Sequence, residues 1–177
     1  MKKIVFLDGD GTLWYPKLTR RKKAPHWIYS DPVTSKDPNN HLVLTPSSLR
    51  VLKRLKQMGV KLAVLSIVPH PKREAQKILA RRVSHFGLTE YFDEVYPVQE
   101  DPDAKGKLIE TVLRREGIPK SKALMVGDSY VYDYKSAMKR GIPAVLIYWE
   151  SYGAPEARKV KRRIKHLYEA FKYIKRF

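Results

Sequence analysis

Short, unbroken runs of apolar residues recur along the chain, and segments with helical spacing separate them. The runs at residues 4–7, 62–65, 123–126 and 144–148 are typical of strands buried on both faces of a parallel sheet. Residues 94–98 show a weaker pattern of the same kind. The pattern therefore predicts five strands, with residues 94–98 as the third.

Amphipathic segments lie between these runs and predict helices. The first helix is expected to begin with Thr45 as N-cap and Pro46 as first helical residue, and Gly59 closes it. Three further helices are expected over residues 72–85, 107–115 and 133–139. Strands that alternate with helices at this spacing indicate an α/β fold, a Rossmann-like doubly wound parallel sheet. Because the sequence shows no repeat or linker, we expect residues 1–177 to form a single domain.

Two segments depart from this alternation. Residues 14–43 are rich in Pro and Lys and have little periodicity, which predicts a short, extended flap after the first strand and no large cap domain. Residues 154–177 are strongly basic, and their apolar residues recur at three- and four-residue steps. That spacing predicts a basic amphipathic C-terminal helix, which docks its apolar side on the sheet or on a partner.

The charge balance is unusual. The chain has 36 basic and 18 acidic residues, a formal net charge of +18 at pH 7. A field of this sign attracts polyanions and phosphorylated substrates, but it also serves solubility, and the sequence leaves both explanations open. The hydrophobic share of 43% is that of an ordinary globular protein, and the lack of cysteine excludes disulfides and thiolate metal sites.

The N-terminal residues imitate a secretory signal, with two lysines before an apolar run. The run stops at Asp8 after four residues, which is too short for the hydrophobic region of a signal peptide. No later stretch approaches the roughly 20 apolar residues that a transmembrane helix needs. We therefore expect a cytoplasmic protein with no transmembrane segment, and the oligomeric state is left open.

Polar residues gather where the predicted strands end, which is the edge at which open parallel sheets bind ligands. The first strand runs into residues 8–12 (Asp-Gly-Asp-Gly-Thr), the second ends at Ser66, and the fourth ends at residues 127–129 (Gly-Asp-Ser). Asp133 lies shortly after this last group, and Lys105 precedes the helix that follows the third strand. Taken singly, these residues have ordinary explanations, such as turns, helix caps and a solvated lysine.

Taken together, the same residues predict a phosphoryl-transfer site. Carboxylates crowded at one edge of a buried sheet repel one another unless a cation compensates them. An all-oxygen cluster of this kind suits Mg²⁺. A serine hydroxyl, a lysine and the backbone amides after the first strand add binding partners for phosphate oxygens.

These residues resemble the motifs of phosphatases in the haloacid dehalogenase (HAD) superfamily. Residues 8–12 are similar to its first motif, DxDGT, and Ser66 to its second, a Ser or Thr that ends the next strand. Residues 127–133 match the fourth motif, GDSxxxD, and Lys105 fits the place of the third, with Lys107 as the alternative. Response-regulator receivers combine Asp, Ser/Thr and Lys on a similar sheet, but they phosphorylate an Asp that ends a later strand, where this chain has Ser66.

The resemblance implies a mechanism and a role for each residue. Asp8 would attack the phosphorus to form an aspartyl phosphate, and Asp10 would act first as general acid and then as general base. Mg²⁺ would be held by the Asp8 carboxylate, the Asp10 backbone carbonyl and the Asp128 carboxylate. Asp133 and Ser129 would orient these ligands or the lysine without binding the metal themselves. The substrate phosphate would be bound by Gly11, Ser66, Ile67 and Lys105.

The motifs leave the substrate open. Thr12-Leu13-Trp14 followed by Pro16 resembles the small, nearly capless magnesium-dependent phosphatases of the superfamily. An open site of that type suits a phosphoprotein such as a phosphotyrosine protein, a sugar phosphate or a polynucleotide end. Basic residues interleaved with aromatics in the flap can grip nucleic acid, or the aromatics can pack the flap onto the domain. The alternative function is a polyanion- or nucleic-acid-binding protein whose phosphatase site is vestigial.

Overall fold

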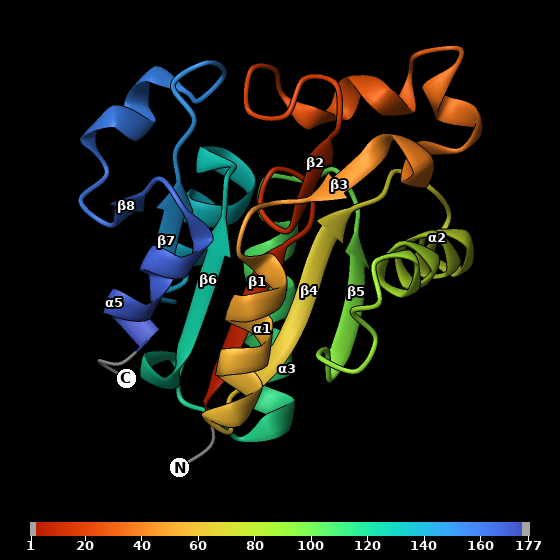
Figure 1. Ribbon diagram of the computed structural model, residues 1–177. Coiled ribbons are helices and arrows are strands. Elements are labelled where there is room, and N and C mark those ends of the chain that lie inside the picture. The colour runs from red at the N-terminus through yellow and green to blue at the C-terminus, as the bar shows by residue number, and fades with distance from the viewer. Residues whose placement is uncertain (1–2, 175–177) are drawn as a thin grey trace.

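The computed structural model describes residues 3–174. Within this range, parallel strands form a six-stranded sheet in the order β5-β4-β1-β6-β7-β8 (Figure 1). The strands are β1 (Ile4–Asp8), β4 (Lys61–Ile67), β5 (Glu94–Val98), β6 (Ala123–Gly127), β7 (Ala144–Ile147) and β8 (Arg163–Ile164). The predicted doubly wound parallel α/β fold is confirmed. The pattern did not predict β8, a two-residue strand at the edge of the sheet.

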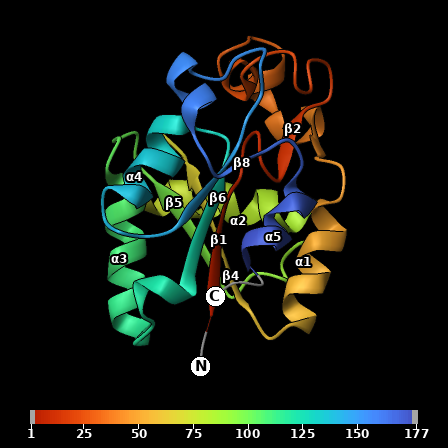
Figure 2. The same ribbon diagram turned by 90° about the vertical axis from the view of Figure 1, so that its left-hand side faces the viewer.

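Helices cover both faces of the sheet (Figure 2). One face carries α1 (Ser48–Gln57), α2 (Lys72–His85) and α5 (Phe171–Ile174). The opposite face carries α3 (Ala104–Glu116) and α4 (Ser136–Met138). The bounds of α2 are those that the pattern predicts, and α3 begins one turn earlier than predicted. In the described part of the chain, every helix is too short or too polar to cross a lipid bilayer.

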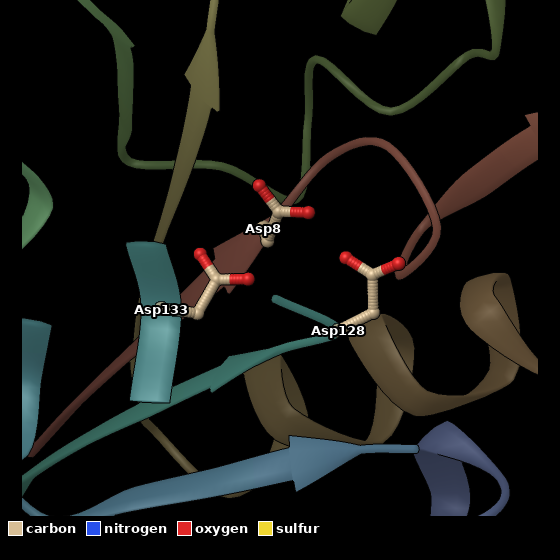
Figure 3. A group of neighbouring side chains, drawn as sticks. All are labelled: Asp8, Asp128 and Asp133. Atoms are coloured by element: carbon tan, nitrogen blue, oxygen red, sulfur yellow. The ribbon is translucent and has the colours of Figure 1, made fainter. Parts of the chain in front are cut away.

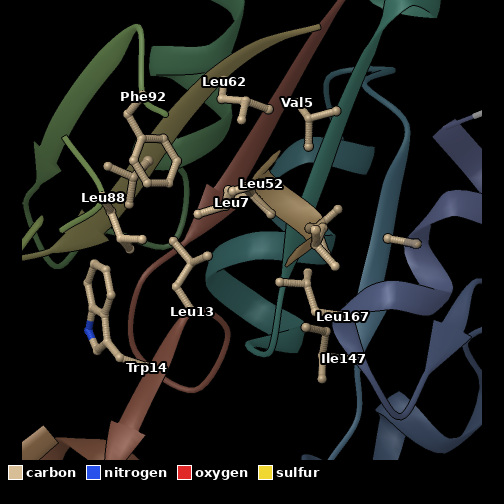
Figure 4. Packing of buried hydrophobic residues seen from close by; sticks show 14 of the residues in the cluster. Val5, Leu7, Leu13, Trp14, Leu52, Leu62, Leu88, Phe92, Ile147 and Leu167 are labelled. Carbon is tan, nitrogen blue, oxygen red and sulfur yellow. The ribbon is translucent and has the colours of Figure 1, made fainter. Parts of the chain in front are cut away.

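Each central strand contributes to two apolar layers. On β1, Val5 and Leu7 belong to the layer seen in Figure 4, which faces α1 and α2. Ile4 and Phe6 belong to the layer on the opposite face. All four side chains are almost fully buried, and each such burial stabilises the fold by about 1.5–3 kcal/mol. Because both faces exclude water, the strands are unbroken apolar runs in the sequence.

The first helix begins later than the capping signal predicts. Thr45 and Pro46 precede α1, and its N-cap is Ser47, which has a left-handed backbone conformation with φ 75°. The Thr45 hydroxyl instead donates to the carbonyl oxygen of Thr12 at 2.6 Å. This contact joins the chain before α1 to the loop after β1, so a tertiary contact overrides the local capping signal.

The flap, residues 14–43, is compact, and the prediction of an extended segment is wrong. Its ends pair as a small antiparallel sheet, and short 3₁₀ turns lie between them; the elements are β2 (Trp14–Pro16), η1 (Pro25–Tyr29), η2 (Thr34–Lys36), η3 (Pro38–His41) and β3 (Leu42–Leu44). In Figure 1 these elements lie beyond the carboxyl ends of the strands. Ile28 is fully buried, and the ring of Trp14 stacks on Phe86 at 5.6 Å. These apolar residues have no periodicity, so the sequence does not reveal their burial.

The expected absence of a large cap agrees with the structure. Residues 67–104, all of which are described, contribute the end of β4, then α2, β5 and the start of α3, with short connections between them. The cavity beyond the strand ends is therefore lined by the flap and by the segment that follows β7. Both segments lie beyond the carboxyl ends of the strands in Figure 1.

The C-terminal segment, residues 149–174, is not the continuous basic helix that the spacing predicts over residues 154–177. It consists of η6 (Pro155–Lys159), β8, η7 (Leu167–Ala170) and α5. Ile164 pairs with Ile147 of β7, and these sheet hydrogen bonds replace helical ones in the middle of the segment. The apolar residues reach the core from separate short elements, so the prediction is wrong for the described part. Residues 175–177 lie outside the described residues.

Candidate active site

The predicted site residues come together at the carboxyl ends of the central strands. β1 lies between β4 and β6, and Asp8 stands opposite Leu65 of β4. Ser66, near the end of β4, and Asp128, directly after β6, therefore lie on either side of Asp8. Carboxylate oxygens of Asp8, Asp128 and Asp133 lie within 4.8 Å of one another (Figure 3).

Lys105, at the start of α3, is the lysine of this cluster. Its side chain is buried, and its Nζ donates to Asp8 Oδ1 and, at 2.5 Å, to Asp133 Oδ1. Burial opposes the charged form, but Asp133 and Asp8 together raise the pKa of the Lys105 amine above its ordinary value. Lys107 is exposed and pairs with Asp101 at 3.2 Å. The structure thus brings Lys105 to the site and leaves Lys107 at the surface.

Asp133 is held in place by the chain just after β6. Its Oδ2 accepts from the Ser129 amide at 2.9 Å, and the Ser129 hydroxyl accepts from the Tyr132 amide at 3.1 Å. A Cβ at Gly127 would lie 2.2 Å from Asp133 Oδ2, so only glycine leaves room for this side chain. The prediction of a regular helix over residues 133–139 is wrong: Tyr130–Lys135 form a π-helical turn before α4. The turn directs Asp133 toward the sheet.

Asp128 faces the loop after β1. The Tyr152 hydroxyl donates to Asp128 Oδ2 at 2.9 Å. Gly11 has φ 79°, and a Cβ there would lie 1.9 Å from the same oxygen, so glycine is required for both conformation and space. The Gly11 amide donates to the Trp14 carbonyl oxygen at 2.8 Å, so its role as a phosphate ligand stays a prediction. Ile67 lines the cavity, as a phosphate-binding position requires.

Asp10 is buried and receives hydrogen bonds from the flap. Its Oδ1 accepts from the Tyr29 hydroxyl at 2.6 Å and from the Trp14 indole N–H at 3.0 Å. Its Oδ2 lies 3.5 Å from Ser66 Oγ and 3.7 Å from Arg82 Nη1. Burial, followed by the charge of Asp10, raises the pKa of the Tyr29 hydroxyl well above its usual value, so this group remains a donor.

Sequence reasoning missed Tyr29, Arg82 and Tyr152. Tyr29 lies in the turn η1 and Arg82 on the helix α2. Neither belongs to a sequence motif, so no local signal distinguishes them from other residues of these elements. Tyr152 follows β7 by a few residues, and its position beyond the carboxyl end of a parallel strand is a signal that could have identified it.

A cavity of about 270 Å³ lies above the cluster. Its walls come from residues 24–26 of the flap and residues 152–154 of the C-terminal segment. Its polar lining joins the predicted residues in one place: Asp8, Asp10, Ser66, Lys105, Asp128, Ser129 and Asp133.

The cluster carries more negative charge than Lys105 balances. Burial, followed by repulsion from Asp133, raises the pKa of the Asp8 carboxyl well above its usual value. The same two causes, in that order, raise the pKa of Asp128 to about 8. A divalent cation between Asp8 and Asp128 would relieve this repulsion, and the oxygen donors suit Mg²⁺. Asp133 has both oxygens engaged by protein donors, whereas Asp8 and Asp128 each have one engaged, so the latter two fit a metal better.

Comparison with known proteins agrees with this geometry. The family model of haloacid dehalogenase-like hydrolases matches residues 10–147, most of the chain. This chain belongs to that family. The matched range includes Ser66, Lys105 and Asp128 but begins after Asp8. The prediction that Asp8 is the nucleophile therefore rests on its motif and on its contacts with the cluster.

Relatives of this HAD-like hydrolase include proteins with named activities. It is 30% identical over 126 residues to a phosphoglycolate phosphatase of Rhodobacter capsulatus, a match over 71% of this chain and 54% of that protein. The chain thus spans about half the length of this relative.

Solved structures share the fold. A haloacid dehalogenase-like hydrolase from Streptococcus pneumoniae is similar at a TM-score of 0.70 and 14% identity over 97% of this chain and 98% of that one. A phosphoserine phosphatase, solved as a phospho-aspartyl intermediate analogue, is similar at a TM-score of 0.69 and 17% identity over 98% and 99%. At these identities the similarity establishes the fold alone, and the chemistry has to be inferred from the residues of the site.

Proposed function

We propose that this HAD-like hydrolase is a Mg²⁺-dependent phosphomonoesterase that acts through an aspartyl phosphate on Asp8. The observation that carries the proposal is the pairing of Asp8 with Lys105 in the cavity, with Asp128 beside them. An anionic nucleophile attacks an anionic phosphate only where positive charge offsets their repulsion. Membership of the HAD-like hydrolase family supports the same chemistry.

In the first step, a carboxylate oxygen of Asp8 forms a bond to phosphorus while the bond from phosphorus to the ester oxygen breaks. Asp10 gives a proton to the departing oxygen, which leaves as an alcohol. Lys105 and Ser66 bind the phosphoryl oxygens through charge-assisted and neutral hydrogen bonds. The contact with Lys105 also keeps the Asp8 carboxylate in its orientation.

In the second step, water attacks the phosphorus of the aspartyl phosphate, and the bond from phosphorus to the Asp8 oxygen breaks. Asp10, now a carboxylate, takes a proton from the attacking water. Inorganic phosphate leaves and Asp8 is restored. The covalent route thus divides one difficult displacement into two easier steps.

The metal would be held by the carboxylates of Asp8 and Asp128 and by the backbone carbonyl of Asp10. When bound, Mg²⁺ neutralises charge on the phosphoryl oxygens in the transition state. Asp133 supports this arrangement because it fixes Lys105, and the Ser129 amide in turn fixes Asp133. Such support of ligands and charged groups sets their orientation.

The cavity favours a monoester that enters phosphate first. Its volume of about 270 Å³ admits a phosphoryl group and a small leaving group, while the rest of a larger substrate would stay at the mouth. The similarity to a phosphoglycolate phosphatase supports a small phosphorylated acid as one candidate substrate.

A second candidate is the phosphorylated end of a polynucleotide. The flap and the C-terminal segment are in contact: Arg21 Nη2 lies 3.1 Å from His166 Nδ1, and the Arg21 guanidinium packs on Trp149 at 4.3 Å. Both segments carry exposed basic residues that are close in sequence to the wall residues 24–26 and 152–154. They are Arg20, Lys22, Lys23, Arg158, Lys159, Lys161 and Arg162. A basic field of this kind binds a phosphate backbone in a salt-dependent way.

The test is phosphate release, with and without Mg²⁺, from a panel of phosphomonoesters. The panel contains p-nitrophenyl phosphate, a phosphotyrosine peptide, a sugar phosphate, 2-phosphoglycolate and 3′- and 5′-phosphorylated oligonucleotides. We expect release that requires Mg²⁺, and a loss of at least about 10³-fold in kcat for Asp8→Asn and for Asp10→Asn. Asp101→Asn, which removes a carboxylate paired with Lys107 outside the cavity, is the matched control and should keep the wild-type rate.

Wild-type turnover in Asp8→Asn or Asp10→Asn would contradict the mechanism. If no ester is hydrolysed but an oligonucleotide binds, and binding weakens steeply with salt, the alternative function of a polyanion-binding protein with a vestigial site is favoured. Oligonucleotide hydrolysis that is indifferent to salt would count against the polynucleotide candidate.

A further inference from the structure

The carboxylate proposed as general acid and base is held by two side chains of the flap. We infer that Tyr29 is a positioning residue for Asp10, and that it sets how well the enzyme hydrolyses esters with poor leaving groups. This role rests on the proposed function, in which Asp10 protonates the departing oxygen. The flap then takes part in the chemistry besides covering the cavity.

One oxygen of Asp10 carries both contacts with the flap. Oδ1 accepts from the Tyr29 hydroxyl at 2.6 Å and from the Trp14 indole at 3.0 Å. The last torsion of an aspartate side chain has a broad energy profile, so two donors from different residues are needed to fix it. With Oδ1 engaged, Oδ2 is the oxygen available to carry a proton, and it lies on the side of Ser66 in the cavity.

Tyr29 is itself held by α2. The guanidinium of Arg82 packs against the Tyr29 ring at 4.8 Å from its centre, and Arg82 Nε donates to Asn39 Oδ1 at 3.1 Å. Arg82 is 3% exposed, and a buried cation requires such partners. Its Nη1 also lies 3.7 Å from Asp10 Oδ2. One connected network therefore links α2, two turns of the flap and Asp10.

The loss of the Tyr29 hydroxyl would leave Asp10 Oδ1 with one hydrogen bond, from the Trp14 indole, and give the carboxylate more freedom to rotate. A misplaced acid slows the first step only when the departing oxygen needs a proton. The p-nitrophenolate anion is stable enough to depart without one, whereas phenolate is a poorer leaving group. Phenyl phosphate and p-nitrophenyl phosphate have similar shapes, so the pair isolates the need for the proton.

The experiment compares kcat/KM for these two esters at saturating Mg²⁺ in wild type and Tyr29→Phe. We expect Tyr29→Phe to lose at least about 10-fold on phenyl phosphate and no more than about twofold on p-nitrophenyl phosphate, because kcat/KM reports the first step. Thr19→Val is the matched control, since it removes the acceptor of the Trp27 indole at 3.0 Å within the flap. It should leave the ratio between the two esters unchanged.

Equal losses on the two esters would overturn the inference, because a purely structural role slows both alike. If Tyr29→Phe does not yield folded protein, Arg82→Lys tests the same network, because it removes the planar group that packs on Tyr29. An unchanged ratio of kcat/KM between the two esters in a folded Arg82→Lys variant would also overturn the inference. Failure of the proposed function is distinguishable, since wild type would then release no phosphate from p-nitrophenyl phosphate or Asp8→Asn would release it as fast.

Discussion

Two regions meet at the active-site cavity, and they are built in different ways. In the strand-end cluster, Asp8 ends β1, Asp128 follows β6, and Lys105 lies in the first turn of α3. Apolar side chains of these elements pack on the two faces of the sheet. The flap and the C-terminal segment consist of 3₁₀ turns, strands of two or three residues and one short helix. The sheet register positions the cluster, whereas individual side chains such as Trp14 and Trp149 position the other two segments.

The two regions owe their rigidity to different kinds of contact. A slip of one residue in a central strand would turn every side chain to the opposite face, so the register is strongly determined. In the flap and the C-terminal segment, strand pairing extends over two or three residues only. Single side-chain contacts, such as the Trp149 indole that donates to the Gly11 carbonyl oxygen at 3.2 Å, carry more of the attachment. Substitutions in the cluster should therefore act on catalysis, and substitutions in the two segments on local stability or on positioning.

Among the substitutions that test this contrast between the regions, the largest effect is expected at the lysine of the cluster. Lys105→Met should lower kcat by at least about 10²-fold, because it removes a charged donor to the phosphate. It should also lower the free energy of unfolding by about 3–5 kcal/mol, because Asp8 and Asp133 lose a buried partner. Phosphate release and urea unfolding measure the two effects.

Lys107→Met is the control for that substitution. Its amine pairs with Asp101 at the surface, so the free energy of unfolding should change by less than about 0.5 kcal/mol and kcat should be unchanged. A large loss of activity in Lys107→Met, with little loss in Lys105→Met, would contradict the assignment of Lys105 to the site.

An intermediate effect is expected in the C-terminal segment. Ile164, in β8, is 3% exposed and belongs to the core, so Ile164→Ala should cost about 2–4 kcal/mol of unfolding free energy in urea. Tyr168→Ala is the control, because Tyr168 is 46% exposed. If Ile164→Ala leaves global unfolding unchanged and only increases hydrogen exchange in residues 155–174, the segment unfolds independently of the sheet. The two regions would then differ in stability more than we propose.

The smallest effect concerns the unbalanced charge of the cluster. In metal-free protein at pH 9, Asp128→Asn should be more stable than wild type by about 1–2 kcal/mol, because ionised Asp128 is half-buried beside Asp133. The pKa of Asp128 is raised from 3.8 to about 8 on folding, so the folded wild type holds its proton more tightly than the unfolded chain. Wild-type stability therefore falls as pH rises through this window, while an Asn does not titrate.

Thermal melts in a chelator across pH 4 to 9 measure this difference, which should approach zero near pH 4. Added Mg²⁺ should stabilise wild type more than Asp128→Asn, because the variant has lost a ligand. A stability difference that does not change with pH would show that folding does not raise the pKa of Asp128.

The apolar pattern was enough to predict five of the six strands of the sheet, and the polar residues at the strand ends predicted much of the cluster. The bounds of α2 are those that the sequence predicts, because its apolar face packs against the core and leaves a periodic pattern. The bounds of β5 also agree with the prediction, although most of its residues are half-buried and its pattern is weaker. Asp8, Ser66 and Asp128 could be placed together without a structure, because the carboxyl ends of parallel strands share one edge. The choice between two nearby lysines, however, depended on where α3 begins, and the sequence left it open.

The features that no local pattern predicts lie in the flap and the C-terminal segment. Tyr29 reaches Asp10, and Tyr152 reaches Asp128, from short turns whose sequences carry no period. The apolar spacing that predicted a C-terminal helix belongs instead to β8 and short turns, because Ile164 pairs with Ile147 of β7 and is buried in the core there. The sequence by itself thus determined where the chemistry is placed, through elements that repeat a pattern. Contacts between residues far apart in the chain, which leave no local pattern, determined how the site is covered and held.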